Sequence, residues 1–217
     1  MARCTKEEAL ATRDRLLDAA ELVFSEKGVS RTSLNDIAAA AGVSRGAIYW
    51  HFKNKADLFN AMMDRTTLPI EDSLQQIGHD AWQDPLAELQ SAIQDAMRKI
   101  ATDERTRRVF EVATLKVEYV DELLAVKARH LQCYVESVSQ MQRSLEEAAA
   151  RRQTPLPRPA TAVAQGLHAL VIGLIHTWLL APASFELVVV ADMAVATYLV
   201  GLGLMPMPAR VQAANPA

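Results

Sequence analysis

A short stretch near the amino terminus, Gly42–Lys55 ("GVSRGAIYWHFKNK"), concentrates side chains that bind nucleic acid. An arginine can donate two hydrogen bonds to the major-groove edge of guanine. A tyrosine can reach a phosphate or lie against a thymine methyl group. Arg45 and Tyr49 stand one helical turn apart, and Gly46 and Ala47 between them are small enough to let the backbone approach a duplex closely. This spacing predicts that the segment presents Arg45 and Tyr49 to DNA.

The residues around this stretch predict the elements that position it. Thr32 or Ser33 can cap a helix that has an apolar inner face, formed by Leu34, Ile37, Ala38 and Ala41. Gly42 permits a tight turn because glycine adopts positive φ without steric cost. Ser44 can cap the next helix, which is expected to end near Phe52. Two helices joined in this way, over about 33–52, indicate a helix-turn-helix motif whose second helix enters the major groove.

The predicted DNA-binding residues also include groups that hold phosphates. Capped helix N-termini leave backbone N–H groups free for phosphate. His51 and Lys55 are expected to add flanking phosphate contacts, and Trp50 to wedge between the DNA backbone and the domain. The full predicted set is Thr32, Ser33, Ser44, Arg45, Gly46, Ala47, Tyr49, Trp50, His51 and Lys55. The alternative is an ordinary solvated turn, in which the aromatic side chains are half-buried packing residues.

Composition predicts an intracellular, all-α protein with an uneven charge. Half of the 217 residues are hydrophobic, there are only 8 Gly, and no alternating strand pattern occurs. Residues 1–55 carry 9 Lys/Arg against 7 Asp/Glu, whereas 56–217 carry 14 against 19, so a basic head on an acidic body is possible. Cys4 and Cys133 are expected to be reduced thiols, and no secretory signal begins the chain, so a cytoplasmic location is predicted.

Helical periodicity continues along the rest of the chain. The first helix is expected to open at a Thr5–Glu8 capping box and to end at Gly28. Later helices are expected from Lys55 to beyond Pro69, over 86–100 after an Asp84–Pro85 cap, and from Thr102. A long helix follows, with the apolar positions Leu123, Leu124, Leu131, Val135, Val138, Met141 and Leu145, then a proline-rich loop over 153–159. Two apolar helices, about 160–180 and 186–204, are separated at Pro182, with Ser184 as the expected cap.

These elements divide into a DNA-binding domain over 1–55, a ligand-binding and dimerisation domain over 56–205, and a flexible tail over 206–217. No charged Asp, Glu, Lys or Arg lies between Arg158 and Glu186, so a transmembrane span has to be weighed. The polar residues Gln165, His168 and His176 within it, and Asp192 in the next helix, favour two helices buried against the core and against a second subunit.

No catalytic constellation or metal site is evident. His168 and His176 are eight residues apart, about 12 Å along a helix, which is too far to share an ion. We therefore predict no metal, no cofactor and no enzymatic activity. Three hypotheses remain at this point: a ligand-responsive transcription repressor, a structural helical protein with a degenerate helix-turn-helix, and a small-molecule enzyme on an all-α scaffold.

The segment "TSLNDIAAAAGVSRGAIYWHFKNKADLF" resembles the DNA-binding head of the TetR family of bacterial transcription regulators. "MARCTKEEALATR", "RTRR…EVATLKVEYVDEL" and "GLIHTWLLAPASFEL" are similar to AcrR-type repressors of multidrug efflux pumps. The resemblance implies an all-α homodimer with a four-helix interface made by the last two helices, which binds a two-fold operator. It also implies that the fourth helix links head to body. Cys4 stands where a basic residue is expected, which leaves Arg3 and Lys6 to hold phosphate in the N-terminal arm.

The same resemblance places a large apolar ligand cavity in the body. The matching positions are Leu89, Ile93, Ala96, Met97, Phe110, Thr114, Tyr134, Ser137, Met141, His168, Val171, Ile172, Ile175 and His176. Such a lining suits bulky hydrophobic or aromatic inducers, although apolar residues at helical spacing also form ordinary cores. The resemblance thus implies a repressor of an efflux operon that such molecules release from DNA. A regulator of a different pathway, for example of lipid or catabolic genes, or an activator, is the alternative.

Overall fold

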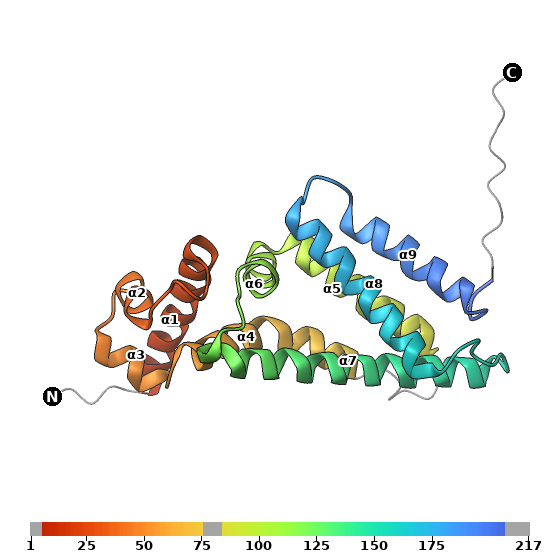
Figure 1. Cartoon of the computed structure of the whole chain (residues 1–217), viewed down its shortest axis with the longest axis horizontal. Coiled ribbons are helices and arrows are strands. Elements are labelled where there is room, and N and C mark those ends of the chain that lie inside the picture. Colours follow the sequence, from red (N-terminus) through yellow and green to blue (C-terminus); the bar gives the residue numbers. More distant parts are fainter. Residues whose placement is uncertain (1–5, 76–83, 207–217) are drawn as a thin grey trace, which may run out of the picture.

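The computed structural model describes residues 6–75 and 84–206, and within these ranges the elements are helical. Figure 1 shows a small amino-terminal head joined to an elongated body. The order is α1 (Lys6–Lys27), α2 (Leu34–Ala40), α3 (Arg45–His51), α4 (Lys55–Gln75), α5 (Pro85–Thr102), α6 (Glu104–Leu115), the 3₁₀ turn η1 (Asp121–Leu123), α7 (Leu124–Arg151), α8 (Ala160–Leu180) and α9 (Leu187–Gly201). The predicted all-α fold is confirmed. Thr5 and the tail over 207–217 lie outside the described residues.

The head is held together by its own apolar core. α1 buries a stripe that includes Leu16, Ala20 and Phe24, and α2 and α3 pack on it through Ile37 and Ile48. The beginning of α4 completes this core with Leu58, Phe59 and Met62, while Val109 and Val112 of α6 close it from the body side. The recognition helix is therefore anchored by a few large side chains, and α4 belongs to the head at one end and to the body at the other.

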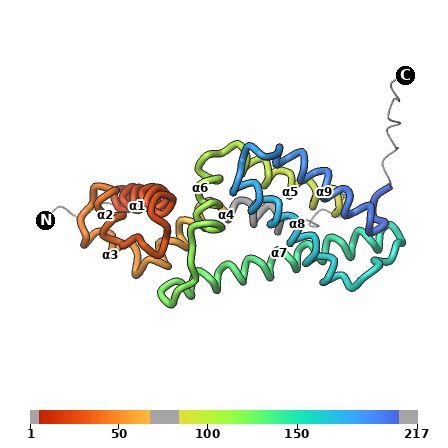
Figure 2. Tube along the Cα trace, turned by 45° about the horizontal axis from the view of Figure 1, so that its top comes forward, coloured from red at the N-terminus to blue at the C-terminus, as the bar shows by residue number. Residues whose placement is uncertain are grey.

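The body is a bundle of α5, α7, α8 and α9 with the end of α4 beside it. Figure 2 shows α7 running along one side, and α8 and α9 forming an antiparallel pair above it. Its core includes Leu89, Met97, Leu145, Leu167 and Leu199, each buried. Along α5, for example, buried residues recur every three to four positions at Leu86, Leu89, Ile93, Met97 and Ile100, which is the pattern that buries one helical face.

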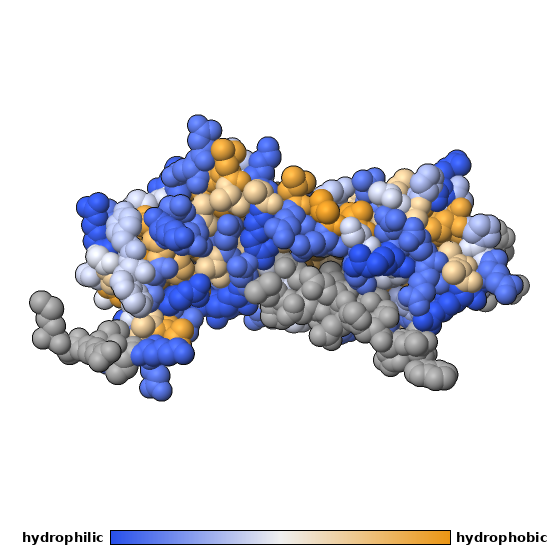
Figure 3. All heavy atoms as spheres, turned by 90° about the horizontal axis from the view of Figure 1, so that it is seen from below, coloured by the Kyte–Doolittle hydropathy of each residue, from blue (hydrophilic) through white to orange (hydrophobic). Residues whose placement is uncertain are grey.

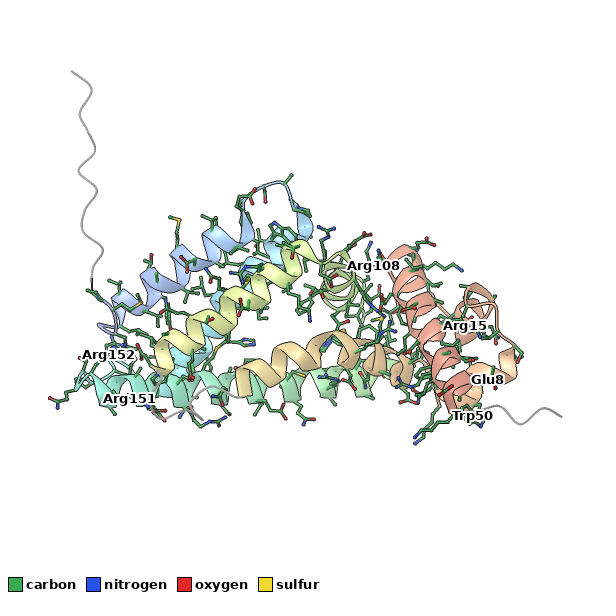
Figure 4. All side chains as sticks on the ribbon, turned by 180° about the vertical axis from the view of Figure 1, so that it is seen from behind. Glu8, Arg15, Trp50, Arg108, Arg151 and Arg152 are labelled. Carbon is green, nitrogen blue, oxygen red and sulfur yellow. The ribbon has the colours of Figure 1, made fainter. Side chains whose placement is uncertain are left out.

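Local chemistry sets where these helices begin and end. The predicted Asp84–Pro85 start of α5 is confirmed, since Asp84 accepts a hydrogen bond from the backbone of Leu86. Arg152 just after α7 also donates to both carboxylate oxygens of Asp84, at 3.1 and 2.6 Å, which ties the end of α7 to the start of α5. Arg152 and the neighbouring Arg151 lie at the end of the body farthest from the head (Figure 4). This bonding to Arg152 lowers the pKa of Asp84.

Two details of the predicted helices were wrong. Thr102 is the last residue of α5, and Asp103 caps α6 instead, because its carboxylate accepts from the backbone of Thr106 at 2.9 Å. Ser184 does not cap α9: its hydroxyl donates to the carbonyl of Ala181 at 2.7 Å, and the N-cap position is Glu186.

On α7, some of the apolar positions named from the sequence are solvent-exposed. Leu124, Leu131 and Val135 are all more than half exposed. Figure 3 views the molecule from the side on which α7 lies, and there apolar patches interrupt a mostly hydrophilic surface. Val138 and Leu145 continue the side of α7 that carries Leu124 and Leu131, at intervals of seven residues, and both are buried. This side of α7 is therefore exposed at Leu124 and Leu131 and covered from Val138 onward.

Among the described residues, α8 is long and apolar enough to cross a membrane by length and composition. One of its faces, however, belongs to the body core through Val163, Leu167, Val171 and Ile175. The opposite face is solvent-exposed. α8 is therefore apolar on both faces and packed within the protomer on one of them.

Candidate DNA-binding and ligand-binding sites

The predicted helix-turn-helix is formed by α2, the turn over 41–44 and α3. Ser33 caps α2 in a reciprocal arrangement: its hydroxyl accepts from the backbone of Asp36 at 3.2 Å, and the Asp36 carboxylate accepts from the backbone of Ser33 at 2.9 Å. Gly42 has φ of +64°, as the predicted turn requires. Ser44 caps α3 by accepting from the backbone of Ala47 at 3.2 Å. The bonds from Ser33 and from Lys27 lower the pKa of Asp36, so the cap carries a full negative charge at neutral pH.

The outer face of α3 presents the side chains that were predicted to touch DNA. Arg45 and Gly46 are exposed, and the Arg45 guanidinium lies over the Tyr49 ring at 5.8 Å. Trp50 is 73% exposed and projects from the outer side of the head (Figure 4). The opposite face of α3 is fixed by Ile48, which is fully buried. The helix therefore holds Arg45, Tyr49 and Trp50 on a rigid support and directs them outward.

Two residues that were predicted to contact DNA are buried in this structure. Thr32 is 2% exposed, and its hydroxyl donates to the carbonyl of Gly28 at 2.7 Å. Lys55 is 8% exposed; its Nζ donates to the carbonyls of Ser30 and Thr32 at 3.1 and 2.9 Å and pairs with Glu122 at 2.6 Å. An ammonium group has three N–H donors, so those of Lys55 are all used inside the protein.

The structure shows Lys53, not Lys55, as the exposed cation that follows α3. Its backbone N–H donates to Asp57 at 3.0 Å, which fixes this loop while the side chain faces solvent. Lys53 and Lys55 are two residues apart in the sequence, which does not show which of them is buried. The structure shows that Lys55, the first residue of α4, points inward. His51 is half-buried, with its ring 4.6 Å from that of Trp50; burial and Arg13 lower its pKa, so it is neutral at pH 7 before DNA binds.

Most predicted ligand-contacting residues lie together in the body core. Leu89, Ile93, Met97, Met141, Val171 and Ile175 are buried in one cluster, against which Phe110 and Tyr134 pack. The rings of Tyr134 and His168 meet edge to face at 5.1 Å. Burial lowers the pKa of His168, so its imidazole is neutral and compatible with an apolar ligand. Ala96, Thr114 and Ser137 are half-buried on the same helices.

Two predicted pocket residues lie on the exposed face of α8. Ile172 is 44% exposed and His176 is also exposed, one turn further on. They stand on the side of α8 that points away from the buried residues Val171 and Ile175. The sequence could not separate the two faces, because α8 is apolar nearly all round.

Comparison with known proteins supports this division into a DNA-reading head and a regulatory body. Residues 16–62 match the model described as bacterial regulatory proteins, tetR family, and residues 84–203 match the C-terminal region of MAATS-type transcriptional repressors. The chain belongs to the TetR family.

Relatives of this TetR-family chain are similar over nearly their whole length. It is 36% identical over 187 residues to the transcriptional regulator AcrR of Shigella flexneri, which covers 86% of this chain and 87% of that one. It is equally identical to TtgR of Pseudomonas putida, over 86% and 89% of the two chains. Among solved structures, NalD, the secondary repressor of the MexAB-OprM multidrug efflux pump in Pseudomonas aeruginosa, is 34% identical with a TM-score of 0.82, over 89% and 98%.

Among the described residues, two sets of side-chain ion pairs join the head of this TetR-family protein to its body. The first is the Lys55–Glu122 pair between the start of α4 and η1. The second is centred on Glu21 of α1, which is 3% exposed and accepts hydrogen bonds from Arg65 of α4 and Arg105 of α6. Both arginines also pair with Asp18, at 2.9 and 2.7 Å. Sequence reasoning missed both links, since their partners are 44 to 87 residues apart.

Proposed function

We propose that this protein represses transcription of a multidrug efflux operon and leaves its operator when a hydrophobic or aromatic small molecule binds in the body. The observation that carries the DNA-binding part is the exposed set of Arg45, Tyr49 and Trp50 on a capped helix of a TetR-family head. The efflux part is supported by relatives such as NalD and by SmeT, whose structure is a complex with triclosan (30% identity, TM-score 0.79). Action in the cytoplasm, on the chromosome, follows from this proposal.

The proposed active form is a homodimer built on α8 and α9. Their outward faces expose Ile172, Leu180, Val189 and Met193, each 44% to 63% exposed. Large apolar residues gathered on one face mark an interaction surface. A two-fold dimer also matches two recognition helices to two half-sites, one helical turn of DNA apart.

Ligand binding in the body is proposed to release DNA by moving α4. This helix supplies head core residues at its amino-terminal end, such as Phe59, and is bound to the body by Arg129 of α7. Arg129 pairs with Asp64 of α4 at 2.5 Å. A ligand that separates the body helices would shift α4 and change the spacing of the two heads. A coupling free energy of about 1–3 kcal/mol corresponds to roughly a 5- to 150-fold loss of operator affinity.

Arg45→Ala is expected to weaken specific operator binding by about 1–3 kcal/mol and to relax the preference at one base pair, because a bidentate contact to guanine is lost. Gel shifts with the upstream region of its own gene and with single-base variants measure both effects. Arg158→Ala, an exposed arginine of the loop before α8, is the matched control and should leave binding unchanged. Unaltered affinity in Arg45→Ala would contradict the placement of α3 in the groove.

Phe110→Ala is expected to change the drug concentration that releases operator DNA while leaving drug-free affinity unchanged. Phe110 packs against the body core from α6, at the side nearest the head. Fluorescence anisotropy of labelled operator, titrated with triclosan or another hydrophobic antibiotic, measures this response. Leu131→Ala, on the exposed side of α7, is the control. Identical release curves for Phe110→Ala and wild type would remove this residue from the ligand site.

A further inference from the structure

The exposed faces of α8 and α9 carry one acidic residue and one histidine in otherwise uncharged surroundings. Asp192 is the only Asp, Glu, Lys or Arg in the sequences of these two helices. It is exposed between Val189 and Met193, and His176 is exposed near Ile172. Neither side chain makes an ion pair or hydrogen bond with the described part of its own protomer. A partner that covered this face would bury a carboxylate, and a buried carboxylate needs a hydrogen-bond donor.

The two side chains are too far apart to meet within one protomer. The Tyr198 hydroxyl donates to the carbonyl of Val163 at 2.8 Å, which fixes how α9 lies along α8. From this bond, His176 is about 20 Å along α8, and Asp192 is about 9 Å along α9 in the same direction, at 1.5 Å per residue. About 10 Å of helix length therefore separates them.

A two-fold axis removes this separation. Suppose that this axis crosses the helix pair midway between the positions of His176 and Asp192, about 15 Å from the Tyr198 bond. The partner's helices then run in the opposite direction, and His176 comes to the same height along the helix pair as Asp192 of the partner subunit. Gly173 lies at this midpoint on the exposed face. A Cβ there would meet nothing within 4 Å in the protomer, so the protomer leaves open space at the point where two α8 helices would cross.

We infer that, in the dimer proposed above, His176 of each protomer donates a hydrogen bond to Asp192 of the partner subunit. Two such reciprocal pairs would satisfy the one acidic group that the apolar interface buries. Because each pair needs both chains, it also fixes the register in which the helices meet, as single buried polar groups do in helical assemblies. This inference rests on the proposed dimerisation through α8 and α9.

Mixing two variants tests the pair directly. In a His176→Ala homodimer both Asp192 carboxylates lose their donors, and in an Asp192→Ala homodimer both histidines lose their acceptors. The heterodimer of the two variants keeps one intact pair and has alanines at the other. We expect each homodimer to dissociate at least about 10-fold more readily than wild type, and native mass spectrometry of the mixture to show the heterodimer well above the statistical half.

Each outcome of this experiment has a distinct meaning. A statistical mixture would overturn the His176–Asp192 pair, and so would variants that dimerise as tightly as wild type. The control for the second comparison is Lys127→Ala on α7, which should dimerise as wild type does. A wild-type protein that stays monomeric in sedimentation equilibrium would instead overturn the proposed dimer itself. In the Asp192→Ala variant the buried His176 lacks its acceptor. If this unpaired group is what weakens the dimer, the His176→Ala/Asp192→Ala double variant should dimerise more tightly than the Asp192→Ala variant.

Discussion

Replacing Arg65 and Arg105 together by Met is expected to lower the free energy of unfolding by about 3–5 kcal/mol, because the buried carboxylate of Glu21 loses both cationic partners. Glu21 is 3% exposed, and both arginines donate to its Oε1 atom, Arg105 from Nε at 2.9 Å. Each single variant should cost less, since the other arginine still pairs with Glu21. Urea unfolding followed by circular dichroism measures the difference.

The pH dependence of this loss identifies its cause. Burial raises the pKa of Glu21, and the hydrogen bond and charge of Arg105 oppose that rise. Without the arginines the folded-state pKa should rise further above the unfolded value. A carboxyl group of that kind favours the folded state when protonated, so the deficit should narrow as the pH falls from about 8 toward about 5. A deficit that is constant with pH would point to lost packing of the arginine stems instead.

Changing the carboxylate as well provides the matched variant. Adding Glu21→Leu to the Arg65→Met/Arg105→Met variant removes the unpaired charge and should recover a large part of the lost stability, since an apolar cluster of similar volume often replaces a buried ion pair without cost. The same triple variant is informative about function, because α1, α4 and α6 then remain packed but lose their ionic link. A weaker release of DNA by drug in that protein would assign the link to signal transmission.

The sequence was most informative where local chemistry decides structure. The Ser33 and Ser44 caps, the Gly42 turn and the Asp84–Pro85 start each depend on residues within a few positions of one another, and all four are present. Arg45 and Tyr49 could be placed on an outer face because Ile48 between them is the apolar residue that α3 needs for anchoring. Such features follow from helix periodicity and capping alone.

The sequence was least informative where the burial of a residue depends on which other helices lie beside it. α8 is apolar on both sides, so periodicity could not tell that Ile172 and His176 face solvent while Val171 and Ile175 face the core. A binary pattern specifies a face only when the opposite face is polar, and α8 lacks that contrast. The case of α7 differs, because Leu131 and Val138 stand on one side of the helix, seven residues apart, and only Val138 is buried. Periodicity gives the side of a helix but not how far along that side other helices cover it.

Lys55→Met is expected to lower the free energy of unfolding by about 2–3 kcal/mol, because the carbonyls of Ser30 and Thr32 lose the buried donor that satisfies them. The ion pair with Glu122 adds little to this value, since that carboxylate is 55% exposed. The loop between α1 and α2 should loosen, and this is visible as faster amide hydrogen exchange over residues 28–33.

Lys53→Ala is the matched variant, because the two lysines have the same charge and stand two residues apart but differ in burial. It should leave stability within about 0.5 kcal/mol of wild type, weaken binding to all DNA sequences alike, and flatten the dependence of log affinity on log salt by about one. If Lys55→Met gave that salt signature at unchanged stability, Lys55 would turn outward on DNA and the phosphate contact first predicted from the sequence would stand. The structure favours Lys53 as the phosphate contact, because the three N–H donors of Lys55 already bond to Ser30, Thr32 and Glu122 and none remains for phosphate.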